Sequence, residues 1–254
     1  MKRTPLILMI LAAGMATSAA RITKSRPSVS ASAPSVTAPS PWAPLAPLVI
    51  GSGVEYQSDD EMTEFAFPLS LEYNPTERLG FVIEPEFSTI ESKSPDVRSV
   101  GGFGDLETAM DYEFVTERRY RPALSAEGRI KWPTASDPDL GEPGRDYSLG
   151  LIASKDLVLV ELDFNLLYTF IGEAGEEDEI EASLACEWHF NPEFSLIAEL
   201  VSVSPAGGGN AGIEGTLGLG WDFSDNLRFE QGIVFHEGGE LELVFAWEWN
   251  FGGD

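Results

Sequence analysis

The sequence predicts an all-β fold, a transmembrane antiparallel β-barrel of about twelve strands of the outer-membrane type. Three observations carry this prediction. Charged and large apolar residues alternate along most of the chain after residue 48, as in ELELVFAWEWNF at 240–251, and a period of two is typical of strands. The alternating segments have roughly the length of tilted membrane strands, about 9 to 13 residues. Aromatic residues gather near both ends of these segments, where rings would lie at the level of the lipid headgroups.

The chain divides into three predicted regions. Residues 1–20 resemble a secretory signal peptide, because a basic pair precedes a short apolar run and then small residues, so export and cleavage near Ala20 are expected. Residues 21–48 are rich in Pro, Ser and Ala and contain no acid, which predicts a disordered periplasmic tail. Residues 49–254 then form the barrel.

The strands follow from the alternation, taken in chain order. TEFAFPLSLEY (63–73), DLETAMDYEF (105–114), EASLACEWHF (181–190) and NAGIEGTLGLGWDF (210–223) each place large apolar residues on one face and mostly polar or small residues on the other. The predicted strands are 49–57, 63–73, 80–90, 105–116, 123–133, 146–154, 157–171, 179–190, 194–203, 211–223, 226–236 and 240–251.

The connections between these strands alternate in length. Tight turns such as SKD and SDN alternate with longer loops such as ASDPDLGEPGRD. Outer-membrane barrels have short periplasmic turns and longer outer loops. An even strand number therefore places both ends of the barrel on the periplasmic side.

Two aromatic girdles are expected on the lipid-facing side. The periplasmic girdle is predicted to comprise Tyr73, Phe81, Tyr112, Phe114, Trp188, Phe190, Phe194, Trp221, Phe223, Trp247, Trp249 and Phe251. The outer girdle is predicted to comprise Tyr56, Trp132, Tyr147, Tyr168, Phe170 and Phe235. Phe251 is also expected to serve as the terminal aromatic that the outer-membrane assembly machinery reads.

The charge of the chain limits its partners. Asp and Glu total 42 against 16 Lys and Arg, for a net charge of −26, which argues against nucleic acid, since nucleic acid requires basic patches. The expected partners are the lipid bilayer with its lipopolysaccharide, the outer-membrane assembly machinery, and a small-molecule solute of unknown identity. The expected location is the outer membrane of a Gram-negative bacterium. Cys186 is the only cysteine, so no internal disulfide forms, and it is predicted to face lipid.

The face opposite the apolar one is predicted to line the lumen and is mainly acidic. The acidic candidates are Glu55, Glu64, Glu72, Glu84, Glu86, Glu107, Asp111, Glu113, Glu127, Glu161, Asp163, Glu181, Glu187, Glu199, Glu214, Asp222, Glu230, Glu240, Glu242 and Glu248. The basic candidates are Arg129, Lys131 and Arg228. The first interpretation of this pattern is a polar interior filled by side-chain networks and water. The alternative is a narrow pore that favours cations, because rings of acid favour cations in channels.

No catalytic residue, cofactor or metal site is predicted. His189 and His236 are expected at opposite ends of the barrel, and the sequence shows no base-and-nucleophile arrangement around either. The acidic stretches at 137–146 and 175–179 are interpreted as solvated outer loops, since their spacing matches no calcium-binding loop.

Two stretches resemble the outer-membrane family named for the MetA pathway of phenol degradation. These are GGFGDLETAMDYEF (101–114) and RIKWPTASDPDLGEPGRDYSLGLIASKDL (129–157), with Ala135 at a position that is usually Gly in the family. The resemblance implies a transporter-like barrel, and an association with aromatic compounds.

The function expected from the sequence is passive passage of small solutes across the outer membrane. Cations and aromatic or hydrophobic compounds are the two candidate solute classes. The alternative is a non-conducting barrel that serves adhesion or the integrity of the envelope.

Overall fold

The computed structural model describes residues 48–59, 62–94 and 98–251. The predicted signal peptide, and the predicted tail up to residue 47, lie outside these residues. Within the described ranges, no helix has the length and hydropathy needed to cross a membrane.

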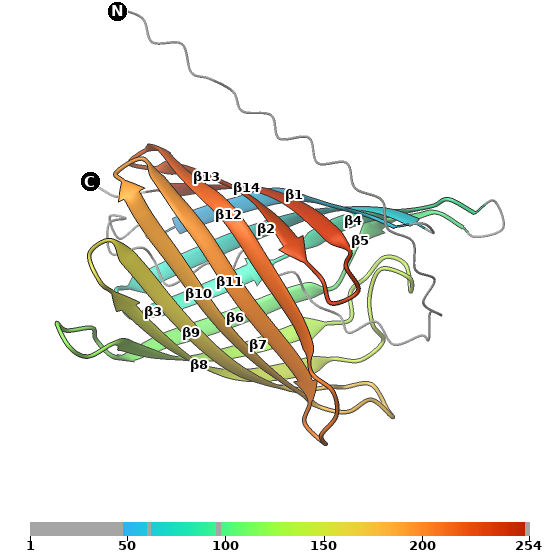
Figure 1. Ribbon diagram of the computed structural model, residues 1–254. Coiled ribbons are helices and arrows are strands. Elements are labelled where there is room, and N and C mark those ends of the chain that lie inside the picture. Colours follow the sequence, from blue (N-terminus) through green and yellow to red (C-terminus); the bar gives the residue numbers. More distant parts are fainter. Residues whose placement is uncertain (1–47, 60–61, 95–97, 252–254) are drawn as a thin grey trace, which may run out of the picture. The chain divides into compact units, whose positions relative to one another are not determined.

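Fourteen antiparallel strands make up one sheet. They are β1 (Leu48–Ser58), β2 (Met62–Thr76), β3 (Leu79–Glu84), β4 (Glu86–Ser92), β5 (Val100–Phe103), β6 (Leu106–Val115), β7 (Ala123–Trp132), β8 (Asp146–Asp156), β9 (Val160–Phe170), β10 (Glu179–Asn191), β11 (Phe194–Pro205), β12 (Gly212–Ser224), β13 (Leu227–Phe235) and β14 (Leu241–Phe251). Strand β1 pairs with both β2 and β14, so the sheet closes into a barrel (Figure 1).

The fourteen strands fill twelve positions around the barrel. Strands β3 and β4 continue one another along β2 in an unchanged register, from Leu71↔Ile83 to Met62↔Ser92. Pro85 separates them because proline has no N–H for the ladder. Strands β5 and β6 likewise lie in succession beside β4 and β3, with a register shift of one residue. The twelve-position closed barrel therefore confirms the predicted fold class.

The two faces of the wall have opposite character. Large apolar side chains are exposed on one face, for example Leu149 at 62% and Leu184 at 53%, whereas acids of the other face, such as Asp163 at 4%, are buried. A water-soluble protein shows the reverse arrangement. An apolar exterior on a closed barrel is the arrangement of a membrane-spanning β-barrel, and the fold is that of Gram-negative outer-membrane barrels.

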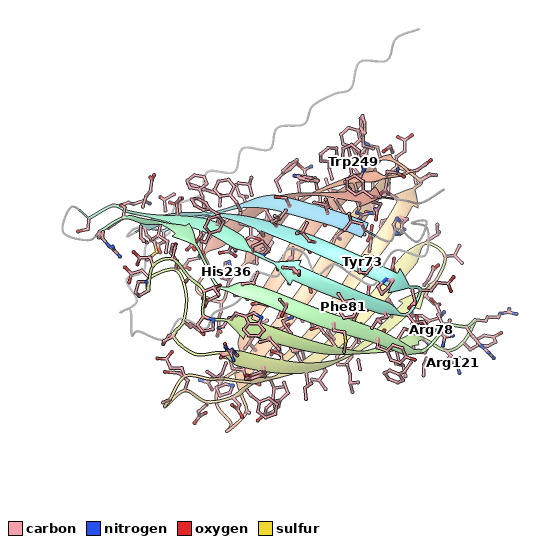
Figure 2. All side chains as sticks on the ribbon, turned by 180° about the vertical axis from the view of Figure 1, so that it is seen from behind. Tyr73, Arg78, Phe81, Arg121, His236 and Trp249 are labelled. Atoms are coloured by element: carbon pink, nitrogen blue, oxygen red, sulfur yellow. The ribbon has the colours of Figure 1, made fainter. Side chains whose placement is uncertain are left out.

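Aromatic rings contact one another near the ends of the strands. At the end where β1 begins and β14 ends, rings on β10 to β14 form a continuous series of contacts with centroid separations of 5.9 to 6.4 Å, made by Phe190, Phe194, Trp221, Phe229 and Phe245. Figure 2 shows Tyr73, Phe81 and Trp249 toward the same end as Arg78 and Arg121, with His236 toward the opposite end. Near that opposite end, Tyr56 contacts Phe65 with centroids 5.0 Å apart.

Several predicted boundaries differ from the structure, and two of the differences have a clear structural reason. The sequence predicts a loop over residues 91–104, but Val100–Phe103 forms β5, because the chain turns back after β4 and pairs with its residues 87–90. The predicted strand 157–171 begins instead at Val160. Asp156 Oδ1 accepts the Val158 N–H at 2.5 Å, and this side-chain-capped turn takes up residues 157–159.

Candidate functional site: the charged interior wall

Arg228 on β13 identifies the inner face of the barrel. Its Nη2 lies 2.5 Å from Glu187 Oε1 on β10, although β11 and β12 separate the two strands. Its Nε lies 2.7 Å from Glu230 Oε1 and its Nη1 3.3 Å from Asp222 Oδ1. Side chains of strands three positions apart meet only across the concave side of a closed wall, so this group lies inside the barrel.

A second basic centre lies on β7. The Arg129 guanidinium pairs with Glu107 Oε2 at 3.2 Å and with Glu127 Oε1 at 3.3 Å. It also interacts electrostatically with Glu84 on β3 and with Glu181 on β10. Arg129 therefore compensates several carboxylates of its part of the interior wall.

A third group consists of carboxylates that face one another on four successive strands. Glu242 on β14, Glu55 on β1, Glu64 on β2 and Glu86 on β4 make up this group, which we call the carboxylate wall. Glu55 interacts electrostatically with the other three members, and Glu55 and Glu242 are both only 6% exposed. The charges that act on Glu55 and Glu86 in this structure are all carboxylates.

The loop between β7 and β8, residues 133–145, folds against the inner wall. Ser136 donates from its N–H and its Oγ to the Phe103 carbonyl, at 2.7 and 3.0 Å. A Cβ added to Gly102 would lie 2.1 Å from Ser136 Oγ, so only glycine allows this close approach. Gly102 pairs with Ser88, which shares the inner face of β4 with Glu86. The loop therefore lies inside the mouth at the end where β1 ends and β14 begins.

Asp105 fixes this loop. Its Oδ1 accepts the N–H groups of Thr134 and Ala135 at 2.9 and 3.0 Å, and its Oδ2 accepts the N–H of Glu142 at 2.8 Å. Lys131 also binds Glu142, and it pairs with Asp146 at 2.5 Å. The two stretches that carried the family resemblance thus meet, since Asp105 of the first holds the loop of the second.

The acidic outer loop at 137–146 has a basic partner. Arg98 Nη2 lies 2.8 Å from Asp137 and 3.0 Å from Asp139. The backbone N–H of Asp139 and the Arg98 guanidinium hold the pKa of the Asp137 carboxyl below its ordinary value. Both of these acids are therefore paired with a base of the same chain.

The two histidines lie in different arrangements at opposite ends. His236, just beyond β13, has Nδ1 2.7 Å from Glu214 Oε1 and Nε2 3.2 Å from Glu242 Oε2. These two hydrogen bonds raise the pKa of His236 to about 10. His189, near the inner end of β10, lies beside Glu187 and Glu161. Sequence reasoning missed both groups, although the acids share a face with the histidines once the strand register is known.

The structure brings most predicted lumen residues into these groups. Asp111 interacts with Glu127, and Glu248 interacts with Glu72 and Glu230. Glu240 lies outside the strands and accepts a hydrogen bond from Gln57 at 3.1 Å. Glu113 and Glu199 occupy inner-face positions of β6 and β11. That these residues line the route of a solute remains a prediction.

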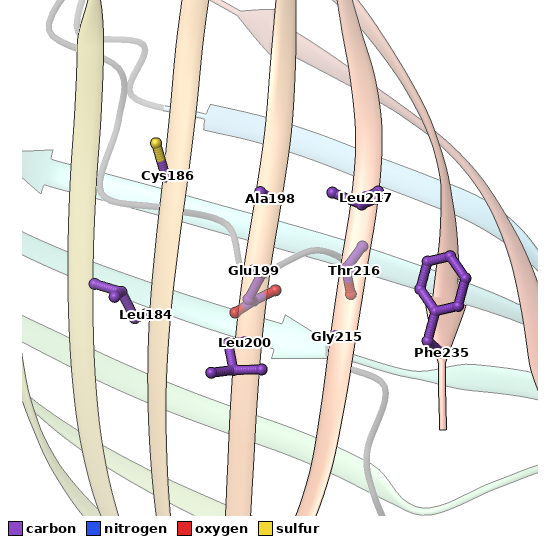
Figure 3. Close-up of a pocket in the computed structure, with 9 residues that line it drawn as sticks. All are labelled: Leu184, Cys186, Ala198, Glu199, Leu200, Gly215, Thr216, Leu217 and Phe235. Atoms are coloured by element: carbon purple, nitrogen blue, oxygen red, sulfur yellow. The ribbon is translucent and has the colours of Figure 1, made fainter. Parts of the chain in front are cut away.

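A shallow depression of about 320 Å³ lies on the outer wall across β10 to β13 (Figure 3). Small residues at its centre, Ala198 and Gly215, lie among Leu184, Leu200 and Phe235. Because this depression lies on the apolar outer face of the wall, the acyl chains of a membrane would fill it. Cys186 lines it, in agreement with its predicted position.

Comparisons with known proteins support the fold. No protein-family model matches the chain, and no curated protein matches it. Among solved structures, an outer membrane channel from Pseudomonas putida F1 matches with a TM-score of 0.68 and 15% identity, over 84% of this chain and 99% of that chain. The KdgM porin in complex with disordered oligogalacturonate matches with a TM-score of 0.58 and 9% identity, over 80% and 99%. The NanC porin matches with a TM-score of 0.57 and 10% identity, over 80% and 100%. At these identities the likeness shows the fold, which is that of outer-membrane channel and porin barrels.

Proposed function

We propose that this protein is an outer-membrane channel for passive passage of small solutes, and that it favours cations. The observation that carries the proposal is the carboxylate wall, a run of acids on β14, β1, β2 and β4 around which the interior presents further carboxylates. Acid-lined constrictions in a low-dielectric enclosure attract cations and repel anions.

The placement of the bases supports a negative electrostatic potential that is strongest beside the carboxylate wall. Arg129 and Arg228 lie on β7 and β13, and each has two or more acids as ion-pair partners. Their charge is therefore largely compensated where they lie. The carboxylate wall contributes the excess negative potential that a passing ion experiences.

The solute class follows from the same charges. The oligogalacturonate named for the KdgM porin is a polyanion, and this interior would oppose such a solute. Aromatic and hydrophobic compounds, which the resemblance to the family named for the MetA pathway suggests, would meet an inner wall of charged groups. Small cations and cationic or neutral polar solutes fit this interior better.

The test is the reversal potential of the refolded mature protein in a planar bilayer under a KCl gradient, with a chelator present. The expected result is a stable current that prefers K⁺ over Cl⁻. The double variant Glu55→Gln, Glu242→Gln should lower this preference. Asp225→Asn, which removes one acid from an exposed turn between β12 and β13, should leave it nearly unchanged, because salt screens exposed charges beyond about 10 Å at 0.1 M.

Two outcomes would reject the proposal. A folded barrel that carries no current would favour the alternative, a non-conducting barrel for adhesion or envelope integrity. The inward loop 133–145, held by Asp105, is the feature that favours this alternative. An anion preference in the unmodified protein would contradict the electrostatic argument directly.

A further inference from the structure

We propose that Glu161, Glu187 and His189 form a binding site for a divalent transition-metal cation inside the barrel, at the end where β1 begins and β14 ends. Each of the three residues offers one ligand atom, and these atoms all lie within 4.8 Å of one another. The site is independent of whether the barrel conducts.

The strand register builds this site. Glu161 on β9 pairs directly with Glu187 on β10, so their side chains lie side by side on the inner face. His189 is two residues further along β10 and therefore points to the same side. The turn at 157–159 supports the arrangement, because the Leu159 carbonyl accepts the His189 N–H at 2.9 Å.

Two buried atoms at the site lack hydrogen-bond partners. His189 Nε2 is buried without a hydrogen bond, 3.5 Å from Glu187 Oε1. Asp163, the next inner-face residue of β9 after Glu161, is only 4% exposed, and its Oδ1 also has no hydrogen-bond partner. Asp163 interacts electrostatically with both Glu161 and Glu187. Unpartnered buried polar atoms are costly, and a cation bound by Glu161, Glu187 and His189 would give His189 Nε2 a partner.

The charges around the site favour a cation. Arg228 approaches Glu187 from the β13 side, but Glu230 and Asp222 share its charge. Asp156 adds another carboxylate that interacts with Glu161. Arg228 also interacts electrostatically with Glu161, so this one base acts on both carboxylates of the proposed site.

The donor set selects the type of metal. One imidazole with two carboxylates, and a third carboxylate nearby, suits Zn²⁺ and related first-row cations, whereas Ca²⁺ and Mg²⁺ prefer oxygen ligands alone. Binding requires the unprotonated imidazole, so acid should weaken it.

The second histidine provides a matched control. His236 also lies between two glutamates, but Glu214 and Glu242 bind opposite nitrogens of its ring. The two carboxylates therefore cannot share one cation with a single ring nitrogen. His236→Ala removes the same residue type without touching the proposed site.

The experiment measures Zn²⁺ binding to the refolded full-length mature barrel in detergent, by calorimetry. One saturable Zn²⁺ per barrel is expected, with His189→Ala and Glu161→Gln each weakening it by at least about tenfold, since loss of even an outer-shell partner costs about 10- to 100-fold. His236→Ala should bind as the unmodified protein does, and excess Mg²⁺ should not displace Zn²⁺. Heat-modifiable gel mobility verifies that each variant is folded.

Absence of saturable Zn²⁺ binding, or equal affinity of folded His189→Ala and unmodified protein, would overturn the proposal. A loss of affinity in His236→Ala as large as that in His189→Ala would do the same. Because the readout is binding and not current, failure here leaves the proposed channel function untouched, and failure of conduction leaves the metal site untouched.

Discussion

Asp105 offers the sharpest test of how the inward loop 133–145 is held. Its carboxylate accepts three backbone N–H groups, those of Thr134, Ala135 and Glu142. A hydrogen bond to a charged group contributes about 1.5–3 kcal/mol when well buried. The site is partly exposed, so we take about 1 kcal/mol for each bond, or about 3 kcal/mol for Asp105→Ala. Each 1.4 kcal/mol corresponds to a tenfold change in an equilibrium constant, which gives an increase of about a hundredfold in loop opening.

Hydrogen exchange in detergent micelles measures this opening at the three amides themselves. Exchange at Thr134, Ala135 and Glu142 should become about a hundredfold faster in Asp105→Ala, while amides of β9 and β10 keep their protection. Arg98→Ala, which removes only the exposed ion pairs with Asp137 and Asp139, should change exchange less than tenfold. Unchanged exchange at the three amides, or faster exchange throughout the barrel, would refute the assignment of Asp105 as the anchor of the loop.

Three further predictions concern stability. Arg228→Ala leaves Glu187, Glu230 and Asp222 without their shared cation and should lower the free energy of unfolding by about 3 kcal/mol, measured by urea titration in detergent, whereas Arg121→Ala in an exposed turn should change it little. The His236 pKa of about 10 lies above its ordinary value of 6.5. The stabilisation from protonated His236 is therefore complete below pH 6.5 and is lost as the pH rises through 10. A pH series of thermal unfolding should show this loss in the unmodified protein and not in His236→Ala. Val158 has a positive φ of 76°, unfavourable for a β-branched residue, so Val158→Gly should stabilise the barrel by about 1 kcal/mol, and an equal or lower melting temperature would contradict the strain.

The repeating features of this barrel could be predicted from sequence because each depends on residues close together in the chain. The period of two fixes which face of a strand is apolar, and turn residues mark where strands end. The predicted strand 179–190 differs from β10 by one residue at one end. The predicted strand 80–90 includes Pro85, where the structure breaks the strand into β3 and β4. The neighbouring strand β2 keeps the same register on both sides of this break.

The groupings inside the barrel could not be predicted in the same way. The contact between Arg228 and Glu187 joins strands three positions apart, and its geometry depends on barrel closure and on the stagger between strands. The loop 133–145 appeared as a solvated outer loop because its composition is acidic and rich in turn residues. Its inward path depends on Asp105 and on the space above Gly102. The role of these two residues can be inferred only when the position of β5 beside the loop is known.

The two histidine sites show why geometry decides what the same residues do. At one end, His236 holds one carboxylate on each ring nitrogen and thereby joins β12 to β14 across β13. At the other end, ligand atoms of Glu161, Glu187 and His189 lie within 4.8 Å of one another, and His189 Nε2 has no hydrogen-bond partner. In the first arrangement both ring nitrogens already have partners, so neither is available to bind a cation, and protonation of His236 stabilises the fold. In the second arrangement, the proposed divalent cation would bind the two carboxylates and the imidazole together. The His236 contribution to stability should therefore be lost as the pH rises toward 10, whereas metal binding at His189 should weaken in acid, and a single pH series of thermal unfolding with and without Zn²⁺ separates the two effects.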